Sequence, residues 1–501
     1  GNSAQMGVED ILKYMDESFD PDKSPRVKLL YMESVNKPQM LLQHAASLIR
    51  KGCRIAAIKA GASEAGSRAA SSHTGALASS DLAVETLFHK AGIVRCNGRE
   101  ELINVASVFL HKELKGKNIG IITHAGGPAV MLTDALSREG FNIPQIHHPK
   151  ATELLNELFP GSSVHNPIDF LATGTAEQLG RIIDYTDQYF DEIDGMVVIF
   201  GTPGLSPIFD VYDVLDEKMK NSKKPIYPIL PSTFTARKEV NAFLQKGRIN
   251  FPDEVLFARA LGLSYFTPKP AESEEEKKSG IPDDLIKKIA ATPSGYLEPE
   301  MVGDILKHAG IPLVKEAVIY KKDELSTALE QLGFPVVMKV VGPLHKSDMG
   351  GVILNIKDEI SALNTYDLLM KIHGAKGVLI QQMAKGRELF AGVKFEKKFG
   401  HMVLCGMGGI FIEVLKDFSV GVAPLSLEES SKMIGRLKIF PVLKGIRGQE
   451  GIDLEQFSNI LVKLSDLVRA LPEIMELDLN PLLASKDKIL AVDARIRISH
   501  E

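Results

Sequence analysis

Residues 117–141, which read KNIGIITHAGGPAVMLTDALSREGF, pass from an apolar strand pattern through a glycine-rich turn into a helical pattern. The strand pattern is a short run of apolar residues, as in strands that are buried on both faces. The same order returns at residues 194–218 and at residues 223–247. Strands that alternate with helices are typical of a doubly wound α/β domain built on a parallel sheet. We therefore predict such a domain over residues 115–266.

The chain before this domain has a similar character. Two short apolar runs, at residues 26–34 and 52–61, alternate with helical patterns such as residues 40–52. This alternation predicts another parallel α/β domain over residues 1–114.

The chain after residue 266 changes character twice. Residues 267–292 contain Pro268, Pro270 and the charged run ESEEEKK, which is typical of a solvated linker. In residues 293–501 several apolar runs follow one another across short turns, which predicts an antiparallel sheet mixed with helices. The whole chain is therefore expected to be a multidomain α/β protein.

The composition excludes several classes of protein. The 501 residues are 44% hydrophobic and 25% charged, with a formal net charge of −5. This is an ordinary globular composition, without a basic surface for nucleic acid or a membrane. Three widely spaced cysteines form neither a disulfide framework nor a paired metal motif. Because we find no membrane-spanning apolar run and no signal-peptide pattern, we predict a cytoplasmic protein.

One histidine is surrounded by small residues. His73 lies in SRAASSHTGALASSD, residues 67–81, where Gly75 allows a large group to approach the backbone closely. A histidine in a surface loop is the simplest interpretation. Imidazole is also a competent covalent nucleophile near neutral pH, so a phosphorylated histidine is the second interpretation.

Two turns in the 115–266 domain are candidate anion sites. The sequences THAGGPAV and FGTPGLSP place glycines, among them Gly126 and Gly127, between a strand and a helix. The N–H groups at a helix N-terminus bind anions, although such turns also occur where nothing binds. Asn166 lies nearby in SVHNPIDFLATG, where the capping of a turn is the simpler explanation.

Candidate nucleotide-binding residues lie in the last segment. Lys339 ends an apolar strand and is followed by a loop with two glycines, a combination that can hold nucleotide phosphates. A snorkelling lysine and an ordinary hairpin turn explain this feature equally well. Asn480 and Asp493 end two further strands, and their oxygen atoms suit Mg²⁺.

Together these motifs resemble one family. Residues 293–501 resemble an ATP-grasp nucleotide-binding domain through the ordered motifs VVMK, HKSDMGGV, VLIQQM, GMGGIFIEV, KGIRG, ELDLNPL and AVDARI. Residues 1–266 resemble the flavodoxin-like ligase domains of the succinyl-CoA synthetase superfamily, and residues 67–81 resemble its phosphohistidine loop. The chain as a whole resembles the ADP-forming acetyl-CoA synthetases, with their two functional parts fused in one chain.

The resemblance implies a role for each candidate residue. His73 would carry the phosphoryl group, with Glu33 orienting its imidazole, and His345 would be a second phosphorylated histidine. The remaining candidates would bind phosphate (Gly126, Gly127, Thr202 and Asn166), nucleotide (Lys339, Gln381, Glu388 and Arg447) and Mg²⁺ (Asn480 and Asp493).

The reaction that the resemblance implies converts acyl-CoA, ADP and phosphate reversibly into a carboxylic acid, CoA and ATP, with acetate as the default acid. The implied cofactor is Mg²⁺, and the implied assembly is a homodimer without nucleic acid or membrane partners. An acyl-CoA-responsive regulatory protein and a catalytically inactive subunit with the same fold are the alternatives. The sequence leaves open which acid is used and whether ADP or GDP is preferred.

Two departures from the family pattern are visible. The family's N-terminal CoA-binding domain is missing, and the sequence begins part-way into the following domain. We expect a longer natural polypeptide, with a separate subunit as the alternative. Gly421 stands where the family often has an arginine, and Arg447 is the candidate replacement.

Overall fold

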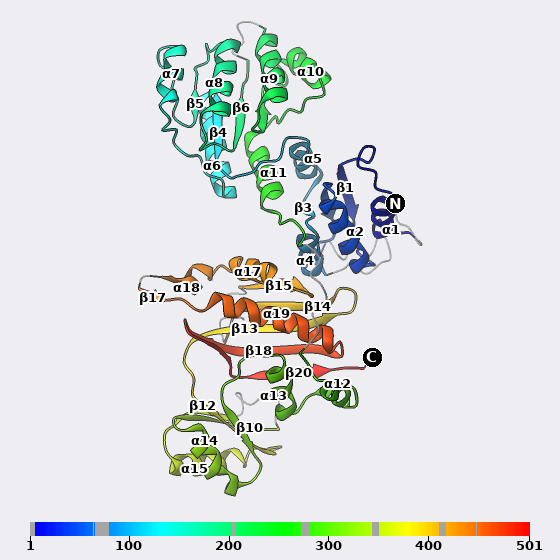
Figure 1. Ribbon diagram of the computed structural model, residues 1–501, viewed down its shortest axis with the longest axis vertical. Helices are drawn as coiled ribbons and strands as arrows, with labels where there is room; N and C mark the ends of the chain where they lie inside the picture. Colours follow the sequence, from blue (N-terminus) through cyan, green and yellow to red (C-terminus); the bar gives the residue numbers. More distant parts are fainter. Residues whose placement is uncertain are drawn as a thin grey trace. The chain divides into compact units, whose positions relative to one another are not determined.

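The computed structural model describes residues 6–63, 65, 80–202, 207–271, 280–342, 350–409, 417–446 and 448–500. The chain divides between Pro270 and Ala271 into two compact units, unit 1 and unit 2 (Figure 1). Segments 1–114 and 115–266 both fall in unit 1, and segment 293–501 falls in unit 2. The boundaries inside each unit stay predictions.

The first sheet of unit 1 is parallel and has the strand order β1-β2-β3. Its strands are Val27–Met32, Arg54–Lys59 and Val94–Cys96. The central strand β2 is buried at every residue after Arg54, which explains why its sequence is a continuous apolar run. Among the described residues, the helices that accompany this sheet are α1 (Val8–Glu17), α2 (Pro38–Arg50), α4 (Asp81–Ala91) and α5 (Arg99–Phe109).

The second sheet of unit 1 is also parallel, with the order β5-β4-β6-β7. Its strands, in sheet order, are Ile168–Asp169, Ile119–Thr123, Gly195–Ile199 and Ile226–Ile229. The chain passes from β4 to β5 on one side and returns to β6 on the other, so a topological switch point lies between β4 and β6. The helices are α6 (Gly126–Glu139), α7 (Lys150–Glu157), α8 (Ala176–Gln188), α9 (Phe209–Asn221), α10 (Arg237–Gln245) and α11 (Glu254–Phe266). The predicted doubly wound fold is confirmed.

One apolar core joins the two sheets of unit 1. Ile58 of β2 and Val105 of α5 lie in the same buried cluster as Ile121 of β4 and Leu261 of α11. Helix α11 packs against both α5 and α6. The two sheets therefore share part of their hydrophobic core.

Unit 2 contains a smaller antiparallel sheet with the order β11-β10-β12-β9. Its strands, in sheet order, are Val352–Ile356, Val336–Val341, Gly377–Gln382 and Glu316–Ile319. The 3₁₀ turn η1 (Lys322–Glu324) leads into α14 (Leu325–Leu332), and α15 (Glu359–Leu369) shares the buried core of this sheet.

The larger sheet of unit 2 has the order β15-β14-β13-β18-β20-β8, with β19 paired to β18. Its strands, in chain order, are β8 (Gly295–Tyr296), β13 (Arg387–Glu396), β14 (Gly400–Met407), β15 (Phe418–Val422), β18 (Ile474–Ala484), β19 (Ile489–Ala491) and β20 (Ala494–Ile498). The described pairs of this sheet are antiparallel, so the predicted antiparallel sheet mixed with helices is confirmed.

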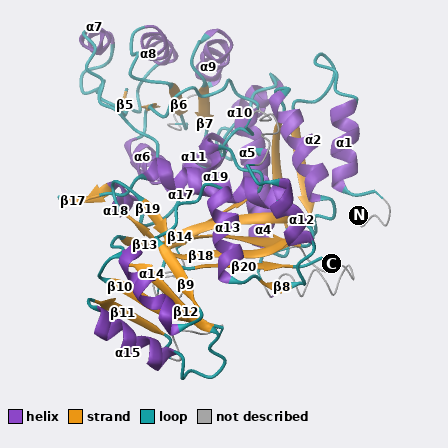
Figure 2. Ribbon diagram, turned by 60° about the horizontal axis from the view of Figure 1, so that its bottom comes forward, coloured by secondary structure: helices purple, strands orange, loops and turns teal. Residues whose placement is uncertain are grey.

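Helices cover the larger sheet of unit 2 (Figure 2). Helix α13 (Pro299–His308) packs against β20, and α19 (Leu454–Ala470) packs against β13 and β14. The remaining elements that the structure describes in this unit are α12 (Asp283–Ala290), α17 (Leu427–Gly435), α18 (Phe440–Lys444) and the hairpin of β16 (Gly445–Ile446) and β17 (Gln449–Glu450).

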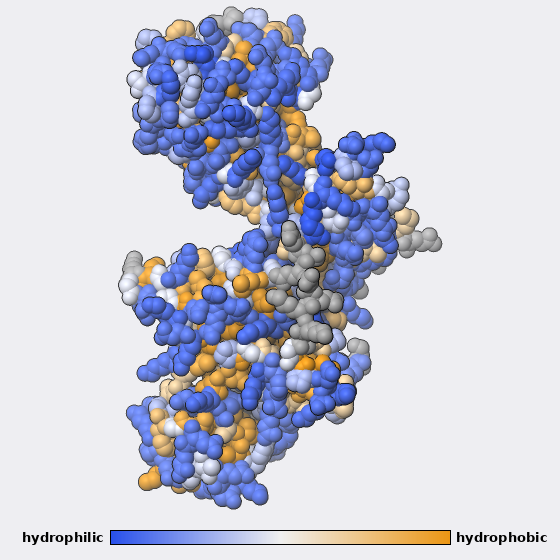
Figure 3. Space-filling view, in the orientation of Figure 1, coloured by the Kyte–Doolittle hydropathy of each residue, from blue (hydrophilic) through white to orange (hydrophobic). Residues whose placement is uncertain are grey.

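Hydrophilic residues cover most of the visible face of each unit, as Figure 3 shows. This distribution is expected when large apolar side chains lie in the cores. Within the described part of the chain, no helix has both the length and the apolar character needed to cross a membrane.

Candidate functional site

Two candidate nucleotide residues of unit 2 converge on one backbone carbonyl. Lys339 lies on β10 and Gln381 on the neighbouring strand β12. Lys339 Nζ donates a hydrogen bond to Val492 O at 2.9 Å, and Gln381 Nε2 donates to the same oxygen at 2.9 Å. Both side chains are buried. The smaller sheet therefore presents these two residues directly beside Asp493, which follows Val492 in the chain.

Gln381 also points to an acidic residue that the sequence analysis missed. Its Nε2 donates to Glu316 Oε2 at 2.6 Å, and Glu316 lies opposite Gln381 on β9. Among the described residues, Gln381 Oε1 is buried without a hydrogen-bond partner. A buried acceptor without a partner costs free energy, so a bound donor would be stabilised at this oxygen. A pocket beside it is lined by Glu316, Gln381, Val492 and Asp493, among other residues.

Three other candidates of unit 2, Glu388, Asn480 and Asp493, lie near the turn that follows β14. Asn480 Oδ1 accepts a hydrogen bond from Gly409 N at 3.2 Å, and Asn480 N donates to Asp493 O at 3.2 Å. Glu388 O accepts from Gly408 N at 2.9 Å. Gly409 has a φ of +63°, and a Cβ at this position would lie 2.1 Å from Glu388 Oε2. Glycine is therefore required at the point where β13, β14 and β18 bring these residues together.

A further carboxylate lies close to these residues. Asp478 precedes Asn480 by two positions on β18. Burial raises the pKa of Asp478 to about 6; Arg495 opposes this shift, whereas the negative charges of Asp493 and Glu476 add to it. The shift is therefore due mainly to desolvation, which disfavours the charged carboxylate. The sequence analysis did not select Asp478, although its spacing from Asn480 in ELDLNPL was a usable signal.

The oxygen atoms in this region fit Mg²⁺. Asn480 contributes an amide oxygen, and Asp493 contributes a carboxylate whose Oδ2 lies 3.9 Å from Arg495 Nη2. Mg²⁺ is usually held by one or two carboxylates together with substrate phosphates and water. The described residues contain no group of three or more His, Cys, Asp or Glu that could hold a metal ion. A magnesium site at Asn480 and Asp493 would therefore depend on the phosphates of the nucleotide.

In unit 1, Glu33 follows the carboxyl end of a parallel strand. It comes directly after β1, beside the end of β2, because Met32 pairs with Lys59. Glu33 Oε2 is buried and has no hydrogen-bond partner in the part of the chain that the structure describes. A carboxylate oxygen in this state is suited to accept a hydrogen bond from an imidazole N–H.

The N-terminus of α6 is open to a ligand. Its N-cap residue, Ala125, has no side chain that caps the first N–H groups. Gly126 and Gly127 are exposed, and a Cβ added to either would meet no described atom within 4 Å. An uncapped helix N-terminus combines unpaired N–H groups with the positive end of the helix dipole. This geometry suits a phosphate.

Thr202 follows β6 at the switch point of the second sheet. Its backbone N–H donates to Ser232 Oγ at 2.9 Å. The preceding residue, Gly201, contacts the turn after β4, since His124 Nε2 lies 2.9 Å from Gly201 O. Burial lowers the pKa of His124 although Asp169 opposes the shift, so the ring is neutral near pH 7. The turns after β4 and β6 are thus joined at the edge where ligands of doubly wound sheets bind.

Asn166 supports β4. Its Oδ1 accepts a hydrogen bond from Ile121 N at 3.0 Å, and its Nδ2 donates to Ile119 O at 2.8 Å. The residue is buried. Both ends of the amide are therefore engaged by the strand. Its role as a phosphate ligand stays a prediction, and these hydrogen bonds favour a structural role.

Replacement of Asn166 by alanine is expected to lower the free energy of unfolding by about 2–4 kcal/mol, because two buried backbone groups of β4 lose their partners. The matched control is Asn142→Ala, which removes an exposed amide that donates to Asn118 Oδ1. The control is expected to change stability by no more than about 0.5 kcal/mol. Denaturant unfolding measures both variants, and equal losses in the two would refute the supporting role.

Three predicted site residues, His73, His345 and Arg447, lie outside the described residues. Their roles stay predictions.

Two family models match the chain. A model described as an ATP-grasp domain matches residues 288–498, and one described as a succinyl-CoA ligase like flavodoxin domain matches residues 1–109. The residues matched by the ATP-grasp model include all the described candidates of unit 2, and those matched by the flavodoxin-domain model include Glu33.

Three curated proteins illustrate the similarity. The acetate–CoA ligase (ADP-forming) I of Archaeoglobus fulgidus is 30% identical over 521 residues, which covers 100% of this chain and 73% of that protein. The 4-hydroxybutyrate–CoA ligase (ADP-forming) of Nitrosopumilus maritimus is 30% identical over 504 residues, or 96% of this chain and 71% of that protein. The beta subunit of acetate–CoA ligase (ADP-forming) I of Pyrococcus furiosus is 40% identical over 223 residues, or 42% of this chain and 96% of that subunit.

Proposed function

The chain belongs to the family of ADP-forming acyl-CoA ligases, and from this membership we propose that it catalyses the reversible reaction acyl-CoA + ADP + phosphate ⇌ carboxylic acid + CoA + ATP. The observation that carries the proposal is the 30% identity to the A. fulgidus ligase across the whole chain. The resemblance described above is thereby confirmed. The three relatives all bear names of ligases, so they give no support to the regulatory and inactive-subunit alternatives.

The proposed reaction has four transfers. Phosphate attacks the thioester carbonyl, the C–S bond breaks, and CoA leaves while an acyl phosphate forms. A nitrogen of the His73 imidazole then takes the phosphoryl group, and the carboxylate leaves. Finally the group passes through His345 to the terminal oxygen of ADP. Each step moves a phosphoryl or acyl group between oxygen, sulfur and nitrogen, so catalysis rests mainly on positioning and charge compensation.

In unit 1, the proposed ligands of phosphate are the first turn of α6, at Gly126 and Gly127, and the Thr202 turn. Their support is the uncapped helix N-terminus and the hydrogen bond that joins the turns after β4 and β6. Glu33 would accept a hydrogen bond from one imidazole nitrogen of His73, which leaves the other nitrogen as nucleophile. The buried Oε2 of Glu33 supports this role.

In unit 2, the proposed nucleotide ligands are Lys339, Gln381, Glu388 and Arg447. Lys339 would compensate the negative charge of the phosphates. Gln381 Oε1, which is buried and has no hydrogen-bond partner among the described residues, would accept a hydrogen bond from the nucleotide. Asn480 and Asp493 would hold Mg²⁺ together with the phosphates. The cation would neutralise charge that develops on the transferred group.

The relatives act on different acids, acetate in one case and 4-hydroxybutyrate in another. Acetate is the proposed default. The test is formation of ATP from ADP and phosphate with acetyl-CoA and, in parallel, with 4-hydroxybutyryl-CoA, each with GDP as a nucleotide control. ATP formation that requires one thioester, ADP and phosphate would establish the reaction and the acid. If the chain binds ATP but produces no ATP from ADP and phosphate with any thioester, the hypothesis of a regulatory protein or an inactive subunit would be favoured.

Lys339→Met is expected to slow phosphoryl transfer from ATP to the protein by about 10²-fold, because a buried cation beside the phosphates stabilises transferring charge. Methionine keeps the apolar length of the side chain in β10. The control is Lys394→Met, on β13, where the lysine is exposed and full activity is expected. Single-turnover labelling with γ-³²P-ATP provides the rate. A wild-type rate in Lys339→Met would remove this lysine from the nucleotide site.

The assembly is proposed from the resemblance alone. We infer a homodimer whose small-molecule partners are acyl-CoA, a short carboxylic acid and ADP or ATP. One relative has a separate beta subunit that matches 42% of this chain, so the family includes forms with divided chains.

A further inference from the structure

One buried ammonium group in unit 1 contacts both ends of the segment that carries His73. Lys59 is the last residue of the central strand β2, and its side chain is 0% exposed. Its Nζ donates to Gly61 O at 2.7 Å, at the start of the segment. The same Nζ lies 3.9 Å from Asp81 Oδ1, at the end of the segment. A backbone carbonyl and a side-chain carboxylate from positions 20 residues apart therefore share one cation.

The far end of the segment is held from a second direction. Asp81 is the first residue of α4. Arg95 on β3 donates from Nη2 to Asp81 Oδ1 at 2.6 Å, and its Nη1 donates to Glu85, one turn further along the helix. Arg95 thus connects the start of α4 to β3, while Lys59 connects it to β2.

Packing alone does not account for a lysine at this position. The four residues before Lys59 on β2, Ile55–Ile58, are all apolar and buried. Burial lowers the pKa of Lys59, which Asp81 opposes and Arg95 reinforces. A buried cation is costly unless it is paired and hydrogen-bonded, and an apolar side chain would avoid that cost. The lysine is therefore explained best by its two contacts.

We propose that Lys59 is a positioning residue for phosphoryl transfer. Lys59 holds the two ends of residues 61–81 in place through Gly61 and Asp81. In this way it limits where His73 can meet its phosphoryl donors and acceptors. The proposal rests on the proposed function, because it takes His73 as the phosphoryl carrier. His73 lies eight residues before Asp81, and eight extended residues span at most about 28 Å. A displaced anchor at Asp81 would change the positions that His73 can occupy.

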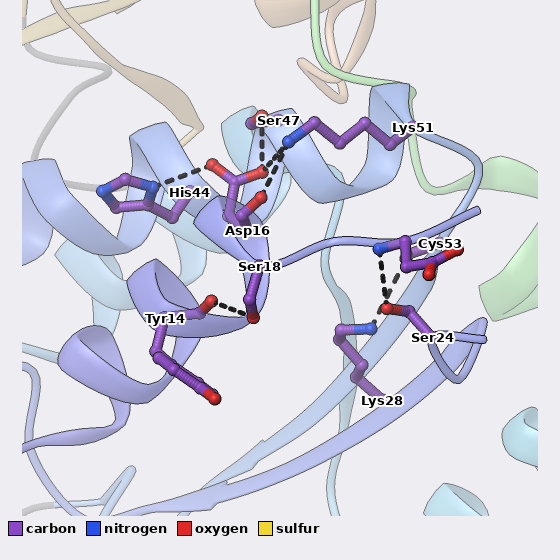
Figure 4. Close-up of polar contacts among 10 residues, drawn as sticks. Tyr14, Asp16, Ser18, Ser24, Lys28, His44, Ser47, Lys51 and Cys53 are labelled. Carbon is purple, nitrogen blue, oxygen red and sulfur yellow. Dashed lines mark hydrogen bonds and ion pairs between the residues drawn. The ribbon is translucent and has the colours of Figure 1, made fainter. Parts of the chain in front are cut away.

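The test compares two buried lysines on neighbouring strands. Lys59→Met removes the ammonium group that contacts both ends of the segment. Lys28→Met is the matched control. Lys28 on β1 is also buried, but its Nζ donates to Pro25 O at 2.8 Å. The same Nζ lies 3.5 Å from Cys53 Sγ, and Figure 4 shows these two side chains. Pro25 lies before β1 and outside residues 61–81. Both variants lose one buried ammonium group and its hydrogen bond to a carbonyl.

The measurement is the single-turnover rate of His73 labelling from γ-³²P-ATP as a function of ATP concentration. For Lys59→Met we expect the maximal rate to fall about 10- to 100-fold, because small displacements of reacting groups have effects of this size. The ATP concentration for half-maximal rate is expected to stay unchanged, since the nucleotide residues lie in unit 2. Lys59→Arg, which keeps the cation, is expected to recover most of the rate, and Lys28→Met is expected to match the wild type.

Two results would overturn the proposal. One is a Lys59→Met rate no lower than that of Lys28→Met, and the other is a Lys59→Arg rate as low as that of Lys59→Met. If Lys59→Met does not fold, Asp81→Asn provides the second variant, because it removes the charge at the far end of the segment from a side chain that is 34% exposed. A wild-type Asp81→Asn rate would then count against the proposal. Absence of label on the wild-type chain would contradict the proposed function itself, which separates the two failures.

Discussion

His73→Ala is expected to abolish ATP formation from acyl-CoA, ADP and phosphate, because alanine has no nucleophile to carry the phosphoryl group between the acyl and nucleotide sites. Overall turnover should fall at least about 10⁴-fold, as is typical when a covalent nucleophile is removed. The variant should also lose the acid-labile, base-stable label that acetyl [³²P]phosphate places on the wild-type chain. Binding of ATP, whose proposed ligands lie in unit 2, should be unchanged.

The control for His73→Ala is His147→Ala, which removes an exposed histidine of the same unit. It should keep full turnover and full label. A His73→Ala chain that still turns over near the wild-type rate would contradict the relay. If turnover is lost but peptide mapping of the wild-type chain places the label on another residue, the carrier is that residue and the assignment of His73 is wrong.

His345→Ala is expected to block the nucleotide half-reaction while leaving the acyl half-reaction largely intact. If the group passes through His345, γ-³²P-ATP should label His73 at least about 10²-fold more slowly in this variant, since direct transfer lacks the positioned intermediate carrier. Acetyl [³²P]phosphate should still label His73 at close to the normal rate. In His73→Ala, γ-³²P-ATP should label His345, and the label should pass no further. This result would complete the evidence for a relay through two histidines.

The control for His345→Ala is His373→Ala, because His373 is an exposed histidine of the same unit. Quenched-flow labelling followed by mapping measures both half-reactions in each variant. Labelling of His73 from ATP at the normal rate in His345→Ala would show that the group reaches His73 without a second carrier. Equal slowing from ATP and from acetyl phosphate would place the defect in His73 or its surroundings.

Much of the fold was predictable because local patterns carry it. The apolar runs of β4 and β6 are fully buried in the centre of a parallel sheet, so they lack the alternation of a half-exposed strand. Gly126 and Gly127 begin α6, and the lack of a Cβ at both positions leaves the helix N-terminus open. Lys339 and Asn480 were visible as polar residues in apolar runs, but the prediction that they end strands is wrong. Lys339 lies inside β10 and Asn480 inside β18, because each strand continues past the polar residue.

The support that Asn166 gives to β4 was not visible in the sequence, for a physical reason. Its neighbours in sequence suggest a turn, and a turn asparagine can serve a ligand or the backbone equally well. Only the position of β4, more than 40 residues earlier, shows that both amide atoms are engaged by Ile119 and Ile121. Glu316 was missed for the converse reason, because its contact with Gln381 depends on the pairing of β9 with β12.

The sequence by itself determined the classes of the domains, the order of the motifs and the family, because these depend on periodicity and on short stretches of residues. The tertiary structure decided which of those residues meet. Lys339 and Gln381 share Val492 O although more than 100 residues separate them from it, and Lys59 contacts both Gly61 and Asp81. Such contacts depend on strand register and burial. Both arise from the packing of the whole chain, so no local sequence pattern predicts them.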